Sequence, residues 1–355
     1  MNQKFLFAIF IGIFLAIYAS MNYYVLSRLA GLLSYDENLL LWIPLAVLSS
    51  SFILATFIAF KSGNIFSTAF YALSASWMGV VFIALMLTAL HDFLGLFISI
   101  PVFYGTIIIP LSLAIFLAGH INSRIIRTRQ VDIESAKLTR PLQIVHLSDL
   151  HIGPINRRSF LKKIVARTNR LKPDLVLLTG DLVDGSISHS KKDFFILRGI
   201  KAPVFFVTGN HEGFSGIKYS LEIARLSGLK ILRGSSVNFK ELEIIGIDDN
   251  DSHKKAAFCL DNIRINKRAF SILMYHRPRI FEIVQGKVDL VLSGHTHNGQ
   301  IWPFAFFAYL ENSYVYGVYK AKGSKLNVSS GVGTWGPPAR IGSSSEIVLI
   351  RLKPG

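Results

Sequence analysis

Four long apolar stretches without a charged side chain fill the first third of this chain, at residues 5–26, 39–60, 65–90 and 94–119. About 20 mostly apolar residues are enough for one helix to cross the hydrocarbon core of a bilayer. Four such helices in series have no polar face to turn toward water, which disfavours the alternative of core helices in a large soluble domain. The sequence therefore predicts an N-terminal four-helix transmembrane region over residues 1–120.

The charged residues belong to the other part of the chain. The sequence has a net charge of +16 and a mean hydropathy of +0.43, but only three of its 38 Lys and Arg and three of its 22 Asp and Glu precede residue 121. The whole positive excess therefore lies after the apolar stretches. We expect a basic juxtamembrane linker at 121–140 and a separate domain at 141–355. A single cysteine, Cys259, excludes an internal disulfide framework and a cysteine-based metal site.

Basic residues cluster directly after the fourth apolar stretch. Lys and Arg accumulate on the cytoplasmic side of membrane spans. The cluster therefore predicts that the C-terminal domain is cytoplasmic, and four spans then place the N-terminus on the same side. The residues of the cluster are Arg124, Arg127, Arg129, Lys137 and Arg140.

The polar part of the chain alternates short apolar runs with amphipathic segments, which is typical of an α/β domain. The amphipathic periodicity predicts helices at 157–171 and 216–227. Strands are predicted at 142–147, 174–179, 203–208, 229–232, 242–247, 270–275, 288–292 and 346–352.

Metal-binding residue types follow five of these strands. Ligands of open α/β sheets gather at the carboxyl ends of the strands, so we expect these side chains to meet. Imidazole and carboxylate ligands suit Zn, Fe and Mn, and a pair of such ions about 3.5–4 Å apart assists displacement at phosphorus. The sequence thus predicts two divalent metal ions, with Mn²⁺ favoured. The five blocks are Asp149-x-His151, Gly180-Asp181-x-x-Asp184, Gly209-Asn210-His211-Glu212, His276 and Gly294-His295-Thr296-His297.

These five blocks, in this order, resemble the calcineurin-like metallophosphoesterase family over residues 141–353. The resemblance implies two facing mixed β-sheets flanked by helices, and an enzyme that hydrolyses phosphoric esters. It also implies that Asp149, His151, Asp181 and His297 hold one metal, and that Asp181, Asn210, His276 and His295 hold the other.

The resemblance gives the two remaining polar residues a catalytic role. His211 would lie near the leaving-group oxygen as proton donor or charge stabiliser. Asp184 would orient His211 and raise its pKa.

The segment 331–340 resembles a bacterial subgroup of membrane-associated phosphoesterases, some of which cleave the pyrophosphate of UDP-diacylglucosamine. Together with the four predicted spans, in which this chain departs from many members of the subgroup, the resemblance predicts a multi-pass protein of the bacterial inner membrane that acts on a lipid-linked or membrane-proximal phosphodiester or pyrophosphate. Two alternatives are a phosphoesterase or nuclease for soluble nucleotides or nucleic acid, and a non-enzymatic metal-binding membrane sensor or scaffold. No aromatic and basic residues interleave as in nucleic-acid folds, so no specific nucleic-acid partner is expected, and no oligomeric state is predicted.

Two further features bear on the membrane. The predicted helix at 157–171 is rich in Lys and Arg, which either form a solvated face or adhere to the anionic cytoplasmic leaflet. Aromatic residues at 302–309 follow the last metal-binding block. We expect them in the core, and the alternative is an apolar lip at the membrane that admits an acyl chain.

Overall fold

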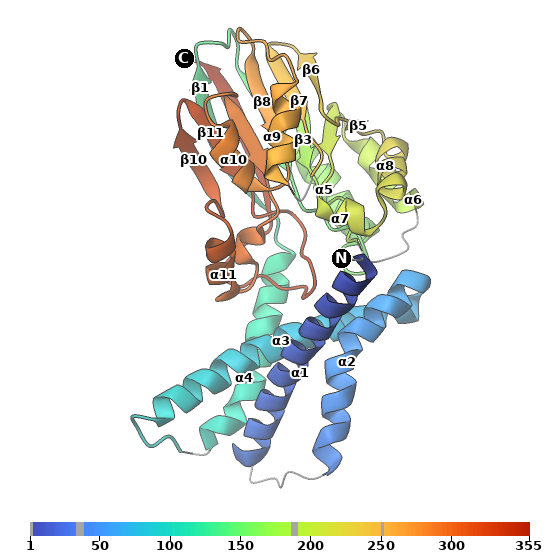
Figure 1. Cartoon of the computed structure of the whole chain (residues 1–355), viewed down its shortest axis with the longest axis vertical. Coiled ribbons are helices and arrows are strands. Elements are labelled where there is room, and N and C mark those ends of the chain that lie inside the picture. The colour runs from blue at the N-terminus through green and yellow to red at the C-terminus, as the bar shows by residue number, and fades with distance from the viewer. Residues whose placement is uncertain (1–2, 33–38, 102, 186–190, 250–251) are drawn as a thin grey trace. The chain divides into compact units, whose positions relative to one another are not determined.

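The computed structural model describes residues 3–32, 39–101, 103–185, 191–249 and 252–355. The chain divides into two compact units (Figure 1). A helical unit comprises residues 1–121 together with Gly336–Ala339, and an α/β unit comprises Asn122–Trp335 together with Arg340–Gly355.

The helical unit is built from four helices. Within the described residues, three of them contain segments long and apolar enough to cross a membrane: Trp42–Lys61, Ile65–Gly95 and Phe103–Ser123. The expectation of four spans is thus confirmed for three, and these helices indicate association with a membrane. The helix bounds are α1 (Gln3–Leu32), α2 (Leu39–Lys61), α3 (Ile65–Gly95) and α4 (Phe103–Ser123).

The first and third helices are longer than the uncharged stretches. α1 and α3 continue through Arg28 and Asp92, whose side chains form an ion pair with 2.8 Å between Nε and Oδ2. Tyr24 donates a further hydrogen bond of 2.7 Å to Asp92. The two opposite charges pair with each other, and both helices extend beyond the uncharged stretches at 5–26 and 65–90.

The predicted span at 94–119 is wrong at its start. α3 ends at Gly95, and α4 begins only at Phe103. Pro101 lies in the interval, and a proline disfavours helical backbone at the residue before it. Another proline, Pro110, lies inside α4.

The α/β unit contains two six-stranded mixed sheets, which confirms the expected fold of this part. In the first sheet, only the pairing of β12 with β2 is antiparallel. In the second, the central pairs are parallel and both edge pairs are antiparallel. The first sheet has the order β1 (Arg127–Ser135), β12 (Glu346–Pro354), β2 (Leu142–Leu147), β3 (Leu175–Thr179), β4 (Val204–Val207) and β5 (Lys230–Ile231). The second has the order β10 (Gly317–Ala321), β11 (Ser324–Val328), β9 (Leu290–Ser293), β8 (Phe270–Met274), β7 (Leu242–Gly246) and β6 (Ser235–Phe239).

Three hydrophobic clusters join these sheets and helices into four layers. One cluster lies between the sheets and contains Ile144 of β2 and Ile272 of β8. A second packs α5 (Arg158–Arg170) and α8 (Ile217–Leu226) on the first sheet. The third packs α9 (His253–Asp261) and α10 (Phe281–Val284) on the second sheet (Figure 1). Both sheets are therefore covered on each face.

The segment expected as a linker contains a strand. β1 pairs in parallel with β12 along its whole length. Its Val131 and Ile133 lie in the cluster between the sheets. Arg129, expected to mark the cytoplasmic side of the membrane, donates from Nε to Glu346 at 3.0 Å. Residues 127–135 of the expected linker are therefore part of the α/β fold.

Candidate metal centre

The expected ligands come from five loops at the carboxyl ends of β2, β3, β4, β8 and β9. Parallel neighbours β2, β3 and β4 end at one edge of the first sheet, and β8 and β9 end together in the second. Because each strand places its following loop at that edge, side chains distant in sequence become neighbours. The distances below show which of them meet.

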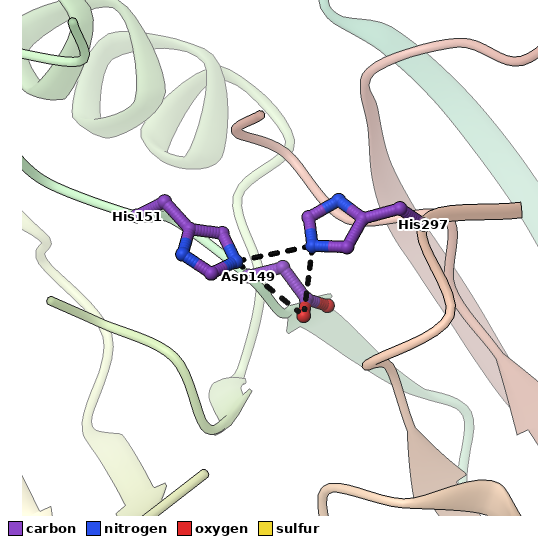
Figure 2. A group of neighbouring side chains, drawn as sticks. All are labelled: Asp149, His151 and His297. Carbon is purple, nitrogen blue, oxygen red and sulfur yellow. Dashed lines mark hydrogen bonds and ion pairs between the residues drawn. The ribbon is translucent and has the colours of Figure 1, made fainter. Parts of the chain in front are cut away.

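One buried group contains Asp149, His151 and His297, whose side chains face one another in Figure 2. The Nε2 atoms of His151 and His297 lie 3.0 Å apart. The Oδ1 atom of Asp149 lies 3.6 Å from Nε2 of His297 and 4.0 Å from Nε2 of His151. Two imidazoles and a carboxylate thus present ligand atoms to one point.

A second buried group forms around Asp181. Its Oδ2 lies 3.1 Å from Nε2 of His276 and 3.6 Å from Nε2 of His151. Nδ1 of His295 lies 3.3 Å from Nε2 of His276. Asn210 begins α7 (Asn210–Phe214), and its Oδ1 is buried without a hydrogen-bond partner. Asp181 therefore reaches both groups, as a carboxylate bridging two metals must.

The backbone at five of the expected ligands adopts a conformation that is rare for residues other than glycine. Asp149, His151, Asp181, His295 and His297 all have positive φ, between 44° and 73°. Left-handed backbone is uncommon for residues other than glycine, and such strain persists where the surrounding structure enforces it, often at functional sites. The fold thus bends the chain at each of five ligands to aim it inward.

Tight packing leaves room only for glycine beside the carboxylates. A Cβ on Gly209 would lie 2.2 Å from Oδ1 of Asp181, and a Cβ on Gly294 would lie 2.2 Å from Oδ2 of Asp149. These glycines precede Asn210 and His295, as the sequence analysis noted. Their absent side chains allow the loops of different strands to approach one another.

A hydrogen bond behind the imidazole ring orients one expected ligand, and a carboxylate lies behind the ring of another. Nδ1 of His276 donates to the carbonyl oxygen of Thr179 at 2.8 Å. Nδ1 of His151 lies 3.6 Å from Oδ1 of Asp184. With the proton on Nδ1, each Nε2 keeps its lone pair for a metal, which is the usual arrangement around histidine ligands. The donor set therefore fits the two divalent ions implied by the sequence.

The electrostatics of the site favour cations. Burial alone would lower the pKa of His276, but the neighbouring Asp181 carboxylate raises it to about 10. Burial would raise the pKa of Asp181, but the charge of His276 holds it well below its usual range. For His297, burial and the charges of His151 and Arg340 keep the pKa well below normal. These shifts keep Asp181 negative and His297 neutral, which are the forms that bind a cation.

His211 lies next to the ligands but is held differently from the expectation. Its Nδ1 donates to the backbone carbonyl of Asp184 at 2.7 Å, and its Nε2 lies 4.0 Å from Oδ2 of Asp181. The Asp184 carboxylate instead faces His151. Burial lowers the pKa of His211, although both aspartates oppose this shift. The expectation of a raised pKa is therefore wrong, because burial outweighs the charge of Asp184.

Glu212 has a positioning role that the sequence analysis did not assign. Its buried carboxylate accepts hydrogen bonds from the backbone N–H groups of Asp181, Leu182, Val183 and Gly209, at 3.0, 2.9, 3.2 and 2.6 Å. Burial and the charge of Asp181 raise its pKa to about 7. Glu212 follows His211 in the Gly-Asn-His-Glu block, so its place in that block was the available signal.

We expect Glu212→Gln to destabilise the α/β unit. Each carboxylate oxygen accepts two N–H groups, so the new amide NH₂ must face two donors. Losing two buried hydrogen bonds to a charged acceptor costs about 3 kcal/mol, which corresponds to a fall of about 6–12 °C in Tm for a unit of this size. Thermal unfolding followed by fluorescence measures this fall. The matched variant Glu222→Gln, at an exposed ion pair with Lys191, should change Tm by at most 1–2 °C, corresponding to about 0.5 kcal/mol.

Arg340 is a second residue without a role assigned from sequence. It is fully buried, and its guanidinium donates to the carbonyl oxygens of Ser330 at 2.6 Å, Gly333 at 2.7 Å and His297 at 3.2 Å. The N–H of Gly333 in turn donates to the carbonyl of Asp149 at 2.7 Å. Arg340 therefore ties the backbone of one ligand to the loop behind another.

The aromatic residues after the last block are not in the core. α11 (Phe304–Glu311) has no buried side chain among its residues, and Trp302, Phe306 and Leu310 are each more than 60% exposed. The expectation of core packing is wrong because α11 contributes to none of the hydrophobic clusters of the sheets. It presents an exposed aromatic surface shortly after His297.

The α/β unit is similar to a known family of phosphoesterases. The family model described as calcineurin-like phosphoesterase matches residues 142–299, the part that carries all the expected ligands. An uncharacterized metallophosphoesterase of Campylobacter jejuni is 30% identical over 98% of this chain and 99% of its own length. Another from Helicobacter pylori is 33% identical over 87% of this chain and 83% of its own. This protein belongs to the calcineurin-like metallophosphoesterase family.

A more distant relative combines the same domain with membrane spans. A zebrafish (Danio rerio) protein named "transmembrane protein with metallophosphoesterase domain" is 33% identical over 60% of this chain and 53% of its own length. Together with the three apolar helices, this relative supports membrane association for the present chain.

Proposed function

We propose that this protein is a membrane-anchored phosphoester hydrolase with two divalent metal ions. Its substrate would be a lipid-linked or membrane-proximal phosphodiester or pyrophosphate. The observation that carries the proposal is the position of Asp181, within 4 Å of imidazole nitrogens from three separate loops. A single buried carboxylate shared in this way matches the ligand set implied for a metal pair.

The two groups of ligands have separate tasks. Asp149, His151 and His297 would hold one ion, and His276, His295 and Asn210 the other, with Asp181 shared. Bound there, the ions would neutralise phosphate oxygens and lower the pKa of water near phosphorus. Mn²⁺ is the favoured metal. The Asp184 carboxylate lies 3.6 Å from Nδ1 of His151, and Arg340 donates a hydrogen bond to the backbone carbonyl of His297.

His211 is placed to supply the proton for the leaving group. A carbonyl oxygen can only accept, so the bond to Asp184 assigns a proton to Nδ1 of His211. Nε2 then faces the ligands, where it can carry a second proton to the departing oxygen. Because burial lowers the pKa of His211, its protonated form is a stronger acid than free imidazolium, which favours this transfer.

Two surfaces support a substrate at the membrane. α5 buries Phe160, Leu161 and Ile164 and exposes its Lys and Arg, a basic face that an anionic leaflet attracts by about 1 kcal/mol per residue. The exposed aromatic residues of α11 resemble those that occupy membrane interfaces. We assign the α/β unit to the cytoplasmic side of a bacterial inner membrane, and a pyrophosphate of the UDP-diacylglucosamine type is one candidate substrate.

The test is hydrolysis by the full-length protein in detergent. We expect Mn²⁺-dependent hydrolysis of bis-p-nitrophenyl phosphate that a chelator abolishes and Mn²⁺ restores. Substituting Phe306 and Phe307 of α11 by Ser should lower turnover of phosphatidylglycerol vesicles about tenfold and leave the soluble ester unchanged, because only the vesicle must be engaged. Phe258→Ser, at an exposed site on α9, is the matched control. Metal binding without hydrolysis would support a sensor, and equal loss on both substrates would remove the lipid assignment.

A further inference from the structure

A cavity of about 360 Å³ adjoins the metal centre. Its volume lies within the range of about 300–1,000 Å³ typical of small-molecule sites. It begins at Gly209 and Asn210, on the loop that carries His211. The remaining lining residues are Thr208, Gly213, Phe214, Ile217, Arg233, Asp248 and Asp249.

One wall of the cavity carries a hydrogen-bond acceptor without a donor. The Asp249 side chain is 2% exposed, and its Oδ2 accepts from Nε of Arg277 at 2.9 Å. Its Oδ1 is buried and has no hydrogen-bond partner. Because an unsatisfied buried acceptor costs free energy, this oxygen is suited to a donor from a bound molecule.

The rest of the cavity combines apolar and cationic groups. Phe214 is 67% exposed, and together with Ile217 it forms an apolar wall. Arg233 pairs with Asp248, which also accepts from the hydroxyl of Thr208 at 2.9 Å. The aromatic surface of Phe214 can pack against the C–H groups of a polyol, and the neighbouring carboxylate and guanidinium groups can form hydrogen bonds with its hydroxyl groups.

The position of the cavity relates it to the reaction. The ring of Phe214 meets the ring of His211 edge-on, with 5.2 Å between centroids. Asn210, an expected metal ligand, lines the cavity. A group attached to a phosphate at the metal centre, on the side of the proton donor His211, therefore extends into this space.

We propose that this cavity is the subsite for the leaving group, and that it binds a polyol (a glycerol or sugar) whose hydroxyl donates to Oδ1 of Asp249. The inference rests on the proposed phosphoester hydrolysis. A water oxygen bonds to phosphorus as the bond from phosphorus to the leaving oxygen breaks. The leaving oxygen takes the proton of His211 Nε2 and departs as the alcohol held by Asp249 and Phe214, and a proton of the attacking water restores His211.

Calorimetric binding to the full-length, Mn²⁺-loaded protein tests this without turnover. The probes are glycerol 3-phosphate, propyl phosphate, which lacks the hydroxyls, and inorganic phosphate. We expect glycerol 3-phosphate to bind about tenfold more tightly than propyl phosphate, as one hydrogen bond to a charged group allows. Asp249→Asn should reduce this ratio to about twofold and leave inorganic phosphate unchanged. A merely structural role of Asp249, as partner of Arg277, would change both organic phosphates equally.

The second variant replaces Phe214, which is exposed, so the protein should still fold. Phe214→Ala should weaken both organic phosphates about threefold, since each loses the same apolar contact, whereas Phe258→Ala on α9 should change neither. Equal binding of the two organic phosphates to the unaltered protein, or a ratio that survives Asp249→Asn, would overturn the proposal. Absence of bis-p-nitrophenyl phosphate hydrolysis, with the binding ratio intact, would instead contradict the proposed activity alone.

The same variants identify the source of the polyol. Phosphatidylglycerol carries a glycerol headgroup, and phosphatidylcholine has no hydroxyl. A preference for phosphatidylglycerol micelles that Asp249→Asn removes assigns the subsite to a lipid headgroup. A preference confined to the soluble pair assigns it to a soluble polyol phosphate. Either result supports the subsite, and no preference in either pair contradicts it.

Discussion

Asp181→Ala is expected to lose both metal ions and more than about a thousandfold of turnover. Its Oδ2 lies 3.1, 3.6 and 4.0 Å from imidazole nitrogens of His276, His151 and His211. Each metal contributes several kcal/mol to stabilising charge in the transition state, and each 1.36 kcal/mol is a factor of ten in rate. Metal content by mass spectrometry and turnover of bis-p-nitrophenyl phosphate measure the two losses.

The variant also needs a measure of folding, because Asp181 accepts the backbone N–H of His211 at 3.0 Å. Asp181→Asn keeps an oxygen for that bond, so it should remain folded by circular dichroism and still lose the bridging charge. Asp261→Ala, at an exposed ion pair with Lys287, should retain full metal content and activity. Purified Asp181→Ala with normal turnover would show that the site does not work through a shared carboxylate.

The convergence of the expected ligands was predictable because the sequence signals for it are local. Each ligand block directly follows an apolar run, and β2, β3, β4, β8 and β9 form at or within two residues of the expected positions. Once strands lie in parallel, their ends meet at one edge whatever the rest of the chain does. The positive φ angles at Asp149 and Asp181 have a similar origin, since the chain must turn sharply after each strand.

β1 was not predictable in this way because its partner is distant in sequence. Arg127 pairs in register with Glu346, so the strand depends on a contact across the whole domain. Locally, its Arg and Gln residues are typical of a solvated linker. In the folded state, the buried carboxylate of Glu346 accepts hydrogen bonds from the guanidinium of Arg129. Only this distant partner offsets the cost of placing the polar Arg129 in a strand.

The direction in which a side chain points was the second feature that could not be predicted from the sequence. The sequence pattern predicts that Asp184 lies beside His211, but it does not distinguish the backbone carbonyl of Asp184 from its carboxylate. The carbonyl accepts a hydrogen bond from His211, whereas the carboxylate faces His151. The aromatic residues of α11 illustrate the same limit for burial. Apolar residues are usually buried, yet Phe306 and Phe307 are exposed because no sheet lies against them.

His211→Ala is expected to lower turnover of a dialkyl phosphodiester by about 10²–10⁴ while keeping both metals, as removal of a general acid does. The side chain has no ligand role in the proposal, and its Nδ1 contact is to a backbone carbonyl. His253→Ala, at the first residue of α9 and outside the expected ligand set, serves as the control for loss of an imidazole. Loss of metal from His211→Ala would assign His211 to the ligand set instead.

The leaving group decides whether His211 acts as an acid or only as a structural neighbour of Asp181. A p-nitrophenolate departs without a proton, whereas an alkoxide needs one, so the loss should be largest for alkyl esters. We therefore expect His211→Ala to reduce cleavage of a methyl p-nitrophenyl diester about tenfold, and of a dialkyl ester at least a hundredfold. Equal losses on both esters would mean that the edge-on contacts of His211 with Phe214 and Trp335 position the substrate, and that the proton comes from elsewhere.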